Sequence, residues 1–434
     1  MSETRLETRL ETQLETQPGF LLGTAELTDA NVERIAHLLD RLRADPGLAG
    51  RYAGTGPVTS LSELAGVPVM RKDDLQAALA AHPPKAAAAA TWIFQSGGST
   101  GSPQVGYAPT GLYMREVYEN WPALGPDDVF VNGWSAGKMW GAHFLVNAYA
   151  DHAGCTAMNV GAMTKDEYSA WLEFFAKRRV TAFGGTPSVL RLVFGHAREA
   201  GIKLPDLRAV LFLGEAWDPR IDDDLAVVAP GARRWGMFGS TETWVVATNT
   251  PECAYDTWHP LPSQLVHVGS AGQDGSVEEE QFLDFTTLNP EGLNPILRYQ
   301  TGDAGEITAC PCGDPRPALK ILGRRDGLIK FRGHLVNVAD TLAEVGGVPG
   351  VAKAQLVVHE YADGNAVLEV LALPSGAATE GLAERVRDRI AGAGFGPSIV
   401  FQRNPHALRV TVVDALLGNE RTGKIPNLVT RRES

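Results

Sequence analysis

Short apolar runs and longer amphipathic stretches alternate through most of the chain. The apolar runs at residues 128–131, 181–183 and 207–213 are short and rich in aliphatic or aromatic side chains, which is typical of buried strands. Residues 142–153 and 187–200, which lie between these runs, show the apolar spacing of helices. Strands that alternate with helices predict an α/β fold in which a largely parallel sheet is covered by helices.

The pattern is different at the N-terminus. Residues 30–42 are predicted to form an amphipathic helix, with Thr28 or Asp29 as its capping residue. Residues 3–17 instead repeat a four-residue unit that stacks glutamates at i,i+4 spacing, and like charges at this spacing destabilise a helix. We therefore expect a disordered tail over residues 1–20.

After Gly333 the alternation of strands and helices stops. Residues 352–359 and 366–373 predict a β-hairpin with a turn at Asp363, and residues 380–391 predict a helix. These elements indicate a small α+β domain of a size that usually folds by itself. The predicted organisation is a tail over residues 1–20, a large domain over residues 21–325 and a small C-terminal domain over residues 326–434.

Composition and charge exclude several classes of protein. With 44% hydrophobic and 21% charged residues, the chain has the composition of a soluble globular protein. No apolar run reaches the roughly 18 residues of a membrane span, and the N-terminus lacks an apolar signal segment. We therefore expect a cytoplasmic protein without a membrane partner. The net charge of -12 argues against a nucleic-acid partner, because surfaces that bind nucleic acids are basic.

Three glycine-containing loops carry the first candidate chemistry. The sequence SGGSTG at residues 96–101 suits a cradle of backbone N–H groups around a phosphate, although a plain turn is the alternative and the Walker motif is absent. The loops that begin at Gly214 and Gly239 also follow apolar strands, and Glu242 in the second lies beside hydroxyls that suit Mg²⁺. In a parallel sheet such loops gather at the carboxyl ends of the strands, where ligands bind.

Cysteine and histidine residues supply a second hypothesis. Cys253 and His259 lie six residues apart, and Cys310 and Cys312 flank one proline. Three thiolates and one imidazole would complete a tetrahedral structural zinc site. Reduced buried cysteines are the alternative, because the spacing is not that of a standard zinc finger. Such a site would fix the loop that bears Asp303, an acid predicted to lie in a tight turn.

Six motifs occur in a fixed order along the chain. They are SGGSTG at 96–101, GEAW at 214–217, MFGSTET at 237–243, YQTGD at 299–303, GRRDGLIKFRG at 323–333 and RTGKI at 421–425. Together they resemble the core motifs of the adenylate-forming superfamily, and TPS at 186–188 is similar to the phenylacetate–CoA ligase branch. The resemblance covers nearly all of residues 60–430. It implies a large ATP- and acyl-binding domain and a small mobile domain that carries a catalytic lysine.

The resemblance implies a role for each matched residue. Thr241 would contact the α-phosphate of ATP, Glu242 would hold Mg²⁺, and Lys424 would bridge the carboxylate and α-phosphate oxygens during adenylation. Asp326 would be the hinge between the domains. The implied contacts to ATP are Ser96, Gly98, Thr100, Gly101, Gly214, Glu215, Asp303, Arg324 and Lys330.

The implied reaction is that of an AMP-forming aryl-CoA ligase, in which an acid becomes acyl-AMP and the acyl group then passes to coenzyme A. Catalysis would rest on positioning and charge neutralisation, because the carboxylate nucleophile is already ionised. Two alternatives stay open: transfer to a carrier-protein phosphopantetheine or a nitrogen nucleophile, and a non-catalytic nucleotide-binding protein. Ser102 and Gln104 keep the second open, since the phosphate loop commonly has lysine there. The oligomeric state, including a homodimer, is also open.

The acid substrate is predicted from residues near the implied acyl pocket. These are Trp134, Lys138, His143, Phe238 and Gly239. Ordinary core packing is the alternative for the aromatic members. As a group they suit a small, flat aromatic acid better than a long fatty chain, so we expect an aromatic acid without identifying it.

Overall fold

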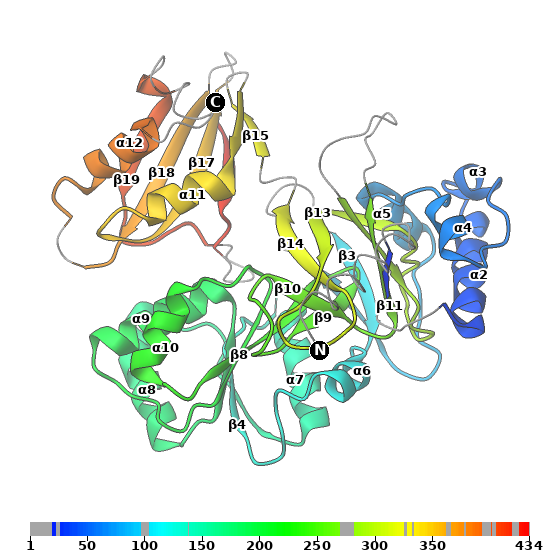
Figure 1. The fold of residues 1–434 in the computed structure, drawn as a ribbon, viewed down its shortest axis with the longest axis horizontal. Helices are drawn as coiled ribbons and strands as arrows, with labels where there is room; N and C mark the ends of the chain where they lie inside the picture. Colours follow the sequence, from blue (N-terminus) through cyan, green and yellow to red (C-terminus); the bar gives the residue numbers. More distant parts are fainter. Residues whose placement is uncertain are drawn as a thin grey trace, which may run out of the picture. The chain divides into compact units, whose positions relative to one another are not determined.

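The fold is that of a computed structural model of the chain (Figure 1). The structure describes residues 20–22, 27–96, 104–137, 139–269, 282–324, 328–331, 334–361, 366–376, 379–392, 401, 405–418 and 425–433. Within these ranges the chain forms two compact units, of which one contains the described residues up to Leu322 and the other those from Gly323. The functional division into an ATP-binding domain and a mobile domain stays a prediction.

One half of the main sheet in the larger unit is parallel, in the order β5-β4-β6-β7-β8. The strands are β4 (Val129–Asn132), β5 (Thr156–Asn159), β6 (Ala182–Gly185), β7 (Ala209–Leu213) and β8 (Arg233–Ser240). The connecting helices are α7 (Ala142–Ala153), α8 (Tyr168–Lys177), α9 (Pro187–Glu199) and α10 (Arg220–Val228) (Figure 1). The predicted parallel sheet is confirmed for these strands.

The other half of the same sheet is antiparallel and continues from β8 in the order β9-β10-β14-β13-β12-β11-β1. Its strands are β1 (Phe20–Leu22), β9 (Trp244–Asn249), β10 (Thr257–Pro260), β11 (Gln264–Gly269), β12 (Phe282–Thr287), β13 (Tyr299–Thr308) and β14 (Ala318–Arg324). The prediction of a largely parallel sheet is wrong for this half. Antiparallel neighbours need no crossover helix, so the helical rhythm that signals parallel strands is missing here.

A separate two-stranded sheet carries the predicted phosphate loop. Strand β2 (Thr91–Gln95) pairs antiparallel with β3 (Val105–Pro109), and helix α6 (Met114–Asn120) follows. We expected the loop at the carboxyl end of a strand in the parallel sheet, and this is wrong because the segment after Gln95 joins the two strands of a hairpin. The connection is shorter than the dozen or so residues that a parallel crossover needs.

Helices before this hairpin pack on the main core. They are α2 (Asp29–Ala44), α3 (Ala49–Tyr52), α4 (Leu61–Ala65) and α5 (Lys72–Ala81). The helix predicted at residues 30–42 is confirmed, and the backbone N–H of Asn31 donates a hydrogen bond of 3.3 Å to the side chain of Thr28 at its start. Phe20, which we included in the tail, begins strand β1, whereas residues 1–19 lie outside the described residues.

The smaller unit has the predicted α+β character. Its sheet has the order β19-β18-β17-β20, in which β17 and β18 are antiparallel and the outer pairs are parallel. Alternate residues of the central strands, among them Leu356 and Val370, form an apolar core with both helices. The elements are β15 (Leu328–Phe331), β16 (His334–Asn337), α11 (Val338–Gly346), β17 (Val351–Tyr361), β18 (Ala366–Pro374), α12 (Leu382–Gly392), a 3-10 turn (Pro405–Ala407), β19 (Leu408–Val412) and β20 (Leu428–Glu433).

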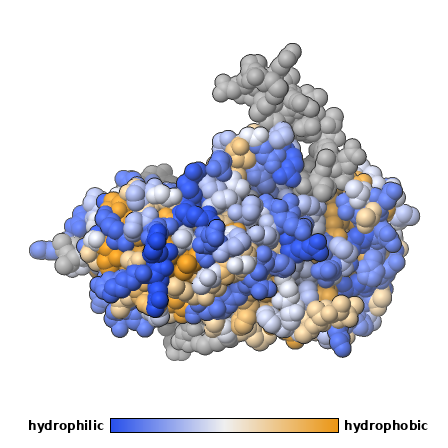
Figure 2. Space-filling view, turned by 90° about the horizontal axis from the view of Figure 1, so that it is seen from below, coloured by the Kyte–Doolittle hydropathy of each residue, from blue (hydrophilic) through white to orange (hydrophobic). Residues whose placement is uncertain are grey.

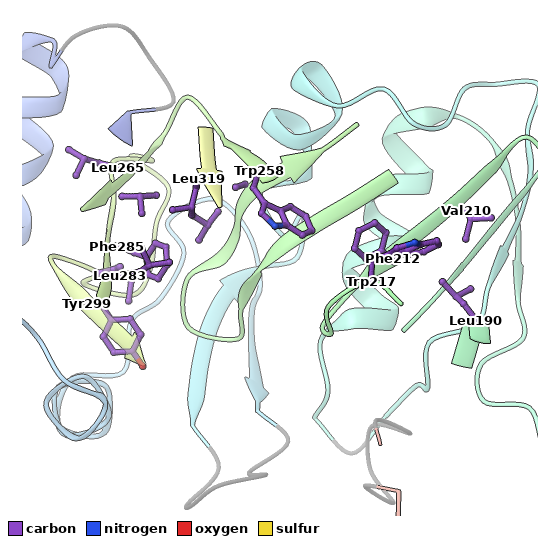
Figure 3. Packing of buried hydrophobic residues seen from close by; sticks show 14 of the residues in the cluster. Leu190, Val210, Phe212, Trp217, Trp258, Leu265, Leu283, Phe285, Tyr299 and Leu319 are labelled. Atoms are coloured by element: carbon purple, nitrogen blue, oxygen red, sulfur yellow. The ribbon is translucent and has the colours of Figure 1, made fainter. Parts of the chain in front are cut away.

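One continuous core joins the parallel and antiparallel halves of the main sheet (Figure 3). The ring of Phe212 on β7 contacts the rings of Trp217 and Trp258, with centroids 4.8 and 5.7 Å apart. A Cβ atom at Gly236 on β8 would come within 2.6 Å of Phe212 and 2.8 Å of Trp258. This position of β8 therefore requires glycine, because any side chain would separate the two rings.

The surface is mostly hydrophilic, with small apolar patches between polar side chains on the face that Figure 2 shows. The most exposed large apolar side chains of the described ranges come from several different elements: Ile93, Met139, Phe174, Val227, Tyr255 and Leu322. Single exposed apolar residues of this kind are normal in folded proteins. No helix in the part of the chain that the structure describes is both long and apolar enough to cross a membrane.

A buried ion pair fixes strands β11, β12 and β13 to one another. The guanidinium of Arg298 donates hydrogen bonds of 3.2 and 2.9 Å to the carboxylate of Asp284, and it also donates to the carbonyl of Val67. His267 lies 3.0 Å from the same carboxylate. Burial raises the pKa of Asp284, but hydrogen bonds from His267 and Arg298 outweigh burial and hold that pKa below its usual value.

We expect the substitution Asp284→Asn to lower the free energy of unfolding by about 3 to 5 kcal/mol at neutral pH, because it leaves the buried charge of Arg298 without its partner. Urea unfolding measures this loss. Because the pKa of Asp284 is lower in the folded than in the unfolded chain, its contribution is present above about pH 4. The contribution is lost as the pH falls through the folded pKa, so the difference between wild type and variant should shrink only in acid.

The exposed carboxylate of Asp151 gives a matched control. Asp151→Asn should change the free energy of unfolding by less than about 0.5 kcal/mol. An effect of Asp284→Asn no larger than that of the control would contradict this role of the ion pair.

Candidate active site

Strand β3 lies directly against the loop between β8 and β9. A Cβ atom at Gly106 would come within 2.1 Å of the backbone oxygen of Thr241 and 3.3 Å of the Cα atom of Glu242. Glycine at this position therefore allows two backbones to touch. The contact brings two predicted motifs together, since β3 belongs to the hairpin that carries SGGSTG, and Thr241 and Glu242 belong to MFGSTET.

The side chain of Asn294 holds this contact in place. Its Nδ2 atom donates a hydrogen bond of 2.7 Å to the backbone carbonyl of Glu242, and its Oδ1 atom accepts one of 3.0 Å from the backbone N–H of Tyr107. Asn294 is buried, so both bonds are shielded from water. Sequence reasoning missed Asn294, because one asparagine in an irregular segment carries no motif signal.

Glu242 is buried, with 5% of its surface exposed, and its carboxylate has a defined partner. The hydroxyl of Tyr299, the first residue of β13, donates a hydrogen bond of 2.9 Å to Oε1 of Glu242. Within the loop, the backbone N–H groups of Glu242 and Thr243 both donate to the hydroxyl of Ser240 at 3.2 Å. Thr241 is half-buried at the tip of this loop. A buried carboxylate beside hydroxyls is a donor set that fits a hard cation such as Mg²⁺.

Asp303 lies on the same strand as Tyr299. The prediction of a tight turn is wrong, because Tyr299–Thr308 is one strand in which Gly302 alone has a left-handed backbone, with φ of 93°. Glycine meets this requirement without strain. The hydroxyl of Thr301 donates a hydrogen bond of 2.6 Å to one oxygen of Asp303, and the carboxylate is nearly buried.

Ser96 closes the base of the predicted phosphate loop. Its backbone N–H donates a hydrogen bond of 2.7 Å to the carbonyl of Gln104, and the backbone N–H of Gln104 donates one of 2.8 Å to the hydroxyl of Ser96. The Ser96 hydroxyl accepts in this pair, so its own proton is available to a ligand.

Glu215 in the GEAW motif has a clear local role. Its Oε2 atom accepts hydrogen bonds from the backbone N–H and the hydroxyl of Ser188, at 2.8 and 2.5 Å, in the first turn of α9. A carboxylate at a helix N-terminus satisfies free N–H groups and suits the positive end of the helix dipole. The second oxygen, Oε1, is buried without a partner among the described residues. Gly214 before it is left-handed, with φ of 92°.

Two of the predicted acyl-pocket residues meet at the carboxyl end of β4. Nδ1 of His143 donates a hydrogen bond of 2.7 Å to the backbone carbonyl of Trp134, and both side chains are buried. Asn132 bonds to both residues, through the backbone N–H of Trp134 and the backbone carbonyl of His143. A Cβ atom at Gly184 on β6 would come within 2.3 Å of the Trp134 ring. Trp134 therefore fills the space beside β6.

The other predicted acyl-pocket residues lie elsewhere or outside the description. Phe238 packs against Trp258 and Phe285, with ring centroids 5.8 and 6.1 Å apart, and Gly239 is exposed. Of the remaining predicted site residues, Arg324 ends β14 and Lys330 lies in β15. The predicted residues outside the described ranges are Gly98, Thr100, Gly101, Ser102, Lys138, Asp326 and Lys424.

The structure brings the predicted cysteine and histidine residues together. One potential ligand atom from each lies within 4.8 Å of all the others, and Sγ of Cys312 is 3.3 Å from Nε2 of His259. Burial raises the pKa of Cys253, and it raises the pKa of Cys310 to about 12. A metal ion would therefore have to displace the thiol protons on binding. The cluster links the turn after β9, strand β10 and the segment that follows β13.

The chain is similar to a known family and to several known proteins. The family model described as AMP-binding enzyme matches residues 25–281. Syringomycin synthase SyrB1 of Pseudomonas syringae pv. syringae is 25% identical over 391 residues, which are 77% of this chain and 59% of that protein. The L-proline--[L-prolyl-carrier protein] ligase of Streptomyces coelicolor is 24% identical over 61% of this chain and 53% of that protein. The chain thus spans little more than half the length of these relatives.

One solved structure extends the likeness to nearly the whole chain. It is 2-hydroxyisobutyryl-CoA ligase in the postadenylation state with 2-HIB-AMP, and the match covers 92% of this chain and 89% of that one. The TM-score is 0.69 and the sequence identity 18%, so the likeness concerns the fold. It confirms the fold class that the ordered motifs predicted.

We expect the substitution Asn294→Leu to lower the free energy of unfolding of the larger unit by about 2 to 4 kcal/mol. The reason is that it leaves a buried carbonyl at Glu242 and a buried N–H at Tyr107 without partners, each at a cost of about 1 to 3 kcal/mol. Denaturant unfolding measures the change. Asn120→Leu is the control, since Asn120 is exposed at the end of α6 and should cost under about 1 kcal/mol. If the two substitutions lowered the free energy of unfolding equally, the hydrogen bonds of Asn294 would not stabilise the contact between β3 and the Thr241-Glu242 loop.

Proposed function

The chain belongs to the family of AMP-binding enzymes, and from this membership we propose that it uses ATP to activate a carboxylic acid as acyl-AMP. The observation that carries the proposal is the close contact of two motifs, in which β3 of the phosphate-loop hairpin touches the Thr241-Glu242 backbone and Asn294 bridges them. This contact supports a site where the triphosphate and a cation-binding carboxylate are neighbours.

In the proposed step, a carboxylate oxygen of the acid attacks the α-phosphorus of ATP, and the bond from that phosphorus to the leaving pyrophosphate breaks. No proton moves, because the nucleophile is already ionised. The difficulty is that two anions must meet, so the protein has to position them and neutralise charge. When bound at Glu242, Mg²⁺ would neutralise phosphate charge. Thr241 would contact the α-phosphate, and Lys424 would bridge the reacting oxygens.

The remaining nucleotide contacts are proposed from the motif positions. Asp303 would accept hydrogen bonds from the ribose hydroxyls, and its buried bond to Thr301 supports an orientation fixed in advance. Ser96 would donate its hydroxyl proton to a phosphate oxygen. The further proposed contacts are Gly98, Thr100, Gly101, Gly214, Glu215, Arg324 and Lys330, with Asp326 as the hinge.

For the acyl acceptor we favour the thiol of coenzyme A. The fold match over nearly all of both chains with 2-hydroxyisobutyryl-CoA ligase supports this choice. The rival is the phosphopantetheine thiol of a carrier protein, which the similarity to an L-prolyl-carrier protein ligase supports. In either case the thiol would lose its proton to solvent and attack the acyl carbonyl carbon, and the bond from that carbon to the phosphate oxygen of AMP would break. Transfer to a nitrogen nucleophile and a non-catalytic protein stay as further alternatives.

An aromatic acid stays our first proposal for the substrate, and one observation favours a second candidate. Because a carbonyl cannot donate, the hydrogen bond to Trp134 places the proton of a neutral His143 ring on Nδ1. Its Nε2 atom is then an acceptor, and no described residue is its partner. An acceptor there suits a small acid with a hydroxyl or amino group. The names of 2-hydroxyisobutyryl-CoA ligase and the L-proline ligase agree with such an acid.

We also propose that Cys253, His259, Cys310 and Cys312 hold a structural zinc ion. Ligand atoms within 4.8 Å of one another suit a tetrahedral Zn²⁺, whose bonds to sulfur and nitrogen are about 2.0 to 2.3 Å long. The site would tie the end of β13, which carries Asp303, to β10. It would have no part in the reaction itself, because four protein ligands leave no open position for substrate.

Metal analysis of desalted protein should find about one zinc ion per chain. Cys312→Ser should lower that content and the melting temperature, because the metal bonds would no longer link β10 to the segment after β13. Cys155→Ser is the control, since Cys155 lies outside the cluster and should leave the zinc content unchanged. Protein that contains far less than one equivalent of zinc after growth in zinc-containing medium would contradict the proposal.

The function is tested by pyrophosphate release from ATP across aromatic acids and small hydroxy and amino acids, with and without coenzyme A. We expect one class of acid to stimulate release strongly and coenzyme A to accelerate it. Release that coenzyme A leaves unchanged would favour the carrier-protein or nitrogen acceptor. No release with any acid would contradict adenylation and favour the non-catalytic alternative.

Two lysine variants, Lys424→Ala and Lys177→Ala, test the role of Lys424 in the same assay. Lys424→Ala should lower acid-dependent pyrophosphate release by about 100-fold or more, because the charge that bridges the reacting oxygens is lost. It should leave thioester formation from a supplied acyl-adenylate within about threefold, since that step does not form the phosphorus bond. Lys177→Ala, at an exposed position of α8, is the matched control and should leave both steps unchanged. If Lys424→Ala lost pyrophosphate release and thioester formation to the same extent, the assignment of Lys424 to the adenylation step alone would be contradicted.

A further inference from the structure

Side chains take the place of a partner strand along one edge of β3. The strand pairs with β2 along its other edge, where Val105 lies opposite Gln95. Backbone groups along a strand point alternately to its two sides, so those of Val105 and Tyr107 share one side. On that side, the N–H of Tyr107 donates to Asn294, and its carbonyl accepts from Trp244. Val105 therefore also directs its N–H and carbonyl away from β2, toward a partner outside the hairpin.

Gln76 is that partner. Its Nε2 atom donates a hydrogen bond of 3.0 Å to the carbonyl of Val105, and its Oε1 atom accepts one of 2.7 Å from the N–H of the same residue. Two residues that lie opposite each other in antiparallel strands can exchange bonds in the same way. Gln76 lies on α5, which packs on the main core through its buried residues Leu75, Ala78 and Leu79. The side-chain amide therefore ties the start of β3 to a packed helix.

The N–H of Val105 belongs to the same peptide unit as the carbonyl of Gln104. A peptide unit is planar, so a bond that fixes its N–H also fixes the direction of its carbonyl. Gln76 holds the N–H, and the carbonyl accepts the hydrogen bond of 2.7 Å from the backbone N–H of Ser96. The N–H of Gln104 in turn donates the bond of 2.8 Å to the Ser96 hydroxyl. Gln76 thus fixes the residue that orients Ser96.

We propose that Gln76 is a positioning residue for the phosphate contact of Ser96. The inference rests on the proposed function, in which the Ser96 hydroxyl donates its proton to a phosphate oxygen of ATP, and it places that oxygen on a phosphate that AMP lacks. Such a bond is charge-assisted, and it weakens steeply when its angle is poor. Without the bonds of Gln76 the start of β3 could shift, and the Ser96 hydroxyl would lose its fixed direction. All of these residues belong to the larger unit.

The test is nucleotide binding by full-length protein, measured by isothermal titration calorimetry with ATP and with AMP in the presence of Mg²⁺. Gln76→Met keeps the length of the side chain and removes both hydrogen bonds. We expect it to raise the Kd for ATP about 3- to 10-fold and the Kd for AMP less than about twofold, because a misdirected bond to a charged group loses part of its strength. Gln76→Glu keeps the acceptor for the N–H of Val105, removes the donor, and carries the same test if the methionine variant does not fold.

The substitution Leu79→Ala separates positioning from general loss of stability. Leu79 is buried on the same helix, so its truncation should lower the melting temperature at least as much as Gln76→Met while the amide of Gln76 keeps its bonds. The ratio of the Kd for AMP to the Kd for ATP should then stay within about twofold of wild type. A ratio that falls equally in Leu79→Ala and Gln76→Met would overturn the positioning role.

A double variant shows whether Gln76 acts through Ser96. Ser96→Ala should raise the Kd for ATP about 10-fold, and adding Gln76→Met should weaken ATP binding no further, because the group being positioned is already gone. A further loss in the double variant would overturn the inference, as would unchanged ATP binding in Gln76→Met when Ser96→Ala weakens it. A Ser96→Ala protein that binds ATP as tightly as wild type would instead contradict the proposed phosphate contact, so the two failures are distinguishable.

Discussion

The close approach of two backbones, at Gly106 and at Thr241-Glu242, is the contact on which the rest of the site depends. Glycine makes the approach sterically possible, and Asn294 fixes it by bonding to both chain segments. The two hydrogen bonds of Asn294, together with one of 3.2 Å from Nε1 of Trp244 to the carbonyl of Tyr107, connect the phosphate-loop hairpin to the segment that carries the candidate cation ligand. The hairpin belongs to a separate two-stranded sheet, so the pairing of the main sheet does not supply this contact.

Other residues of the larger unit hold the elements around that contact in place. Tyr299 at the start of β13 bonds to the Glu242 carboxylate, and the ion pair between Asp284 and Arg298 fixes β12 to the residue before β13. Phe212 and Trp258 pack together at Gly236 and join the parallel and antiparallel halves of the sheet. The proposed reaction brings two anions together and would need its charged groups fixed in advance, and the packing around Glu242 agrees with this requirement.

Features that depend on neighbouring residues were predictable from the sequence, and features that depend on distant contacts were not. Helix α2 and strands β4 to β8 were predictable, because their signals are local periodicity and capping by Thr28. The antiparallel half was missed, and Asp303 was placed in a turn, since one left-handed glycine inside a strand looks like a turn signal. Asn294 could not have been found from the sequence. It is a single polar residue whose role comes from partners far away in the chain. The four cysteine and histidine residues were grouped correctly, because their side-chain chemistry is rare enough to suggest a shared site.

Adenylation by direct attack of the acid is the central claim, and the transfer of a carboxyl oxygen tests it most directly. The protein would be supplied with ATP and its acid labelled with ¹⁸O in both carboxyl oxygens, and the AMP released after acyl transfer would be analysed by mass spectrometry. The account predicts one ¹⁸O atom in the AMP, because the attacking oxygen stays on phosphorus when the acyl carbon is attacked. AMP without the label, or ADP and phosphate as products, would contradict it.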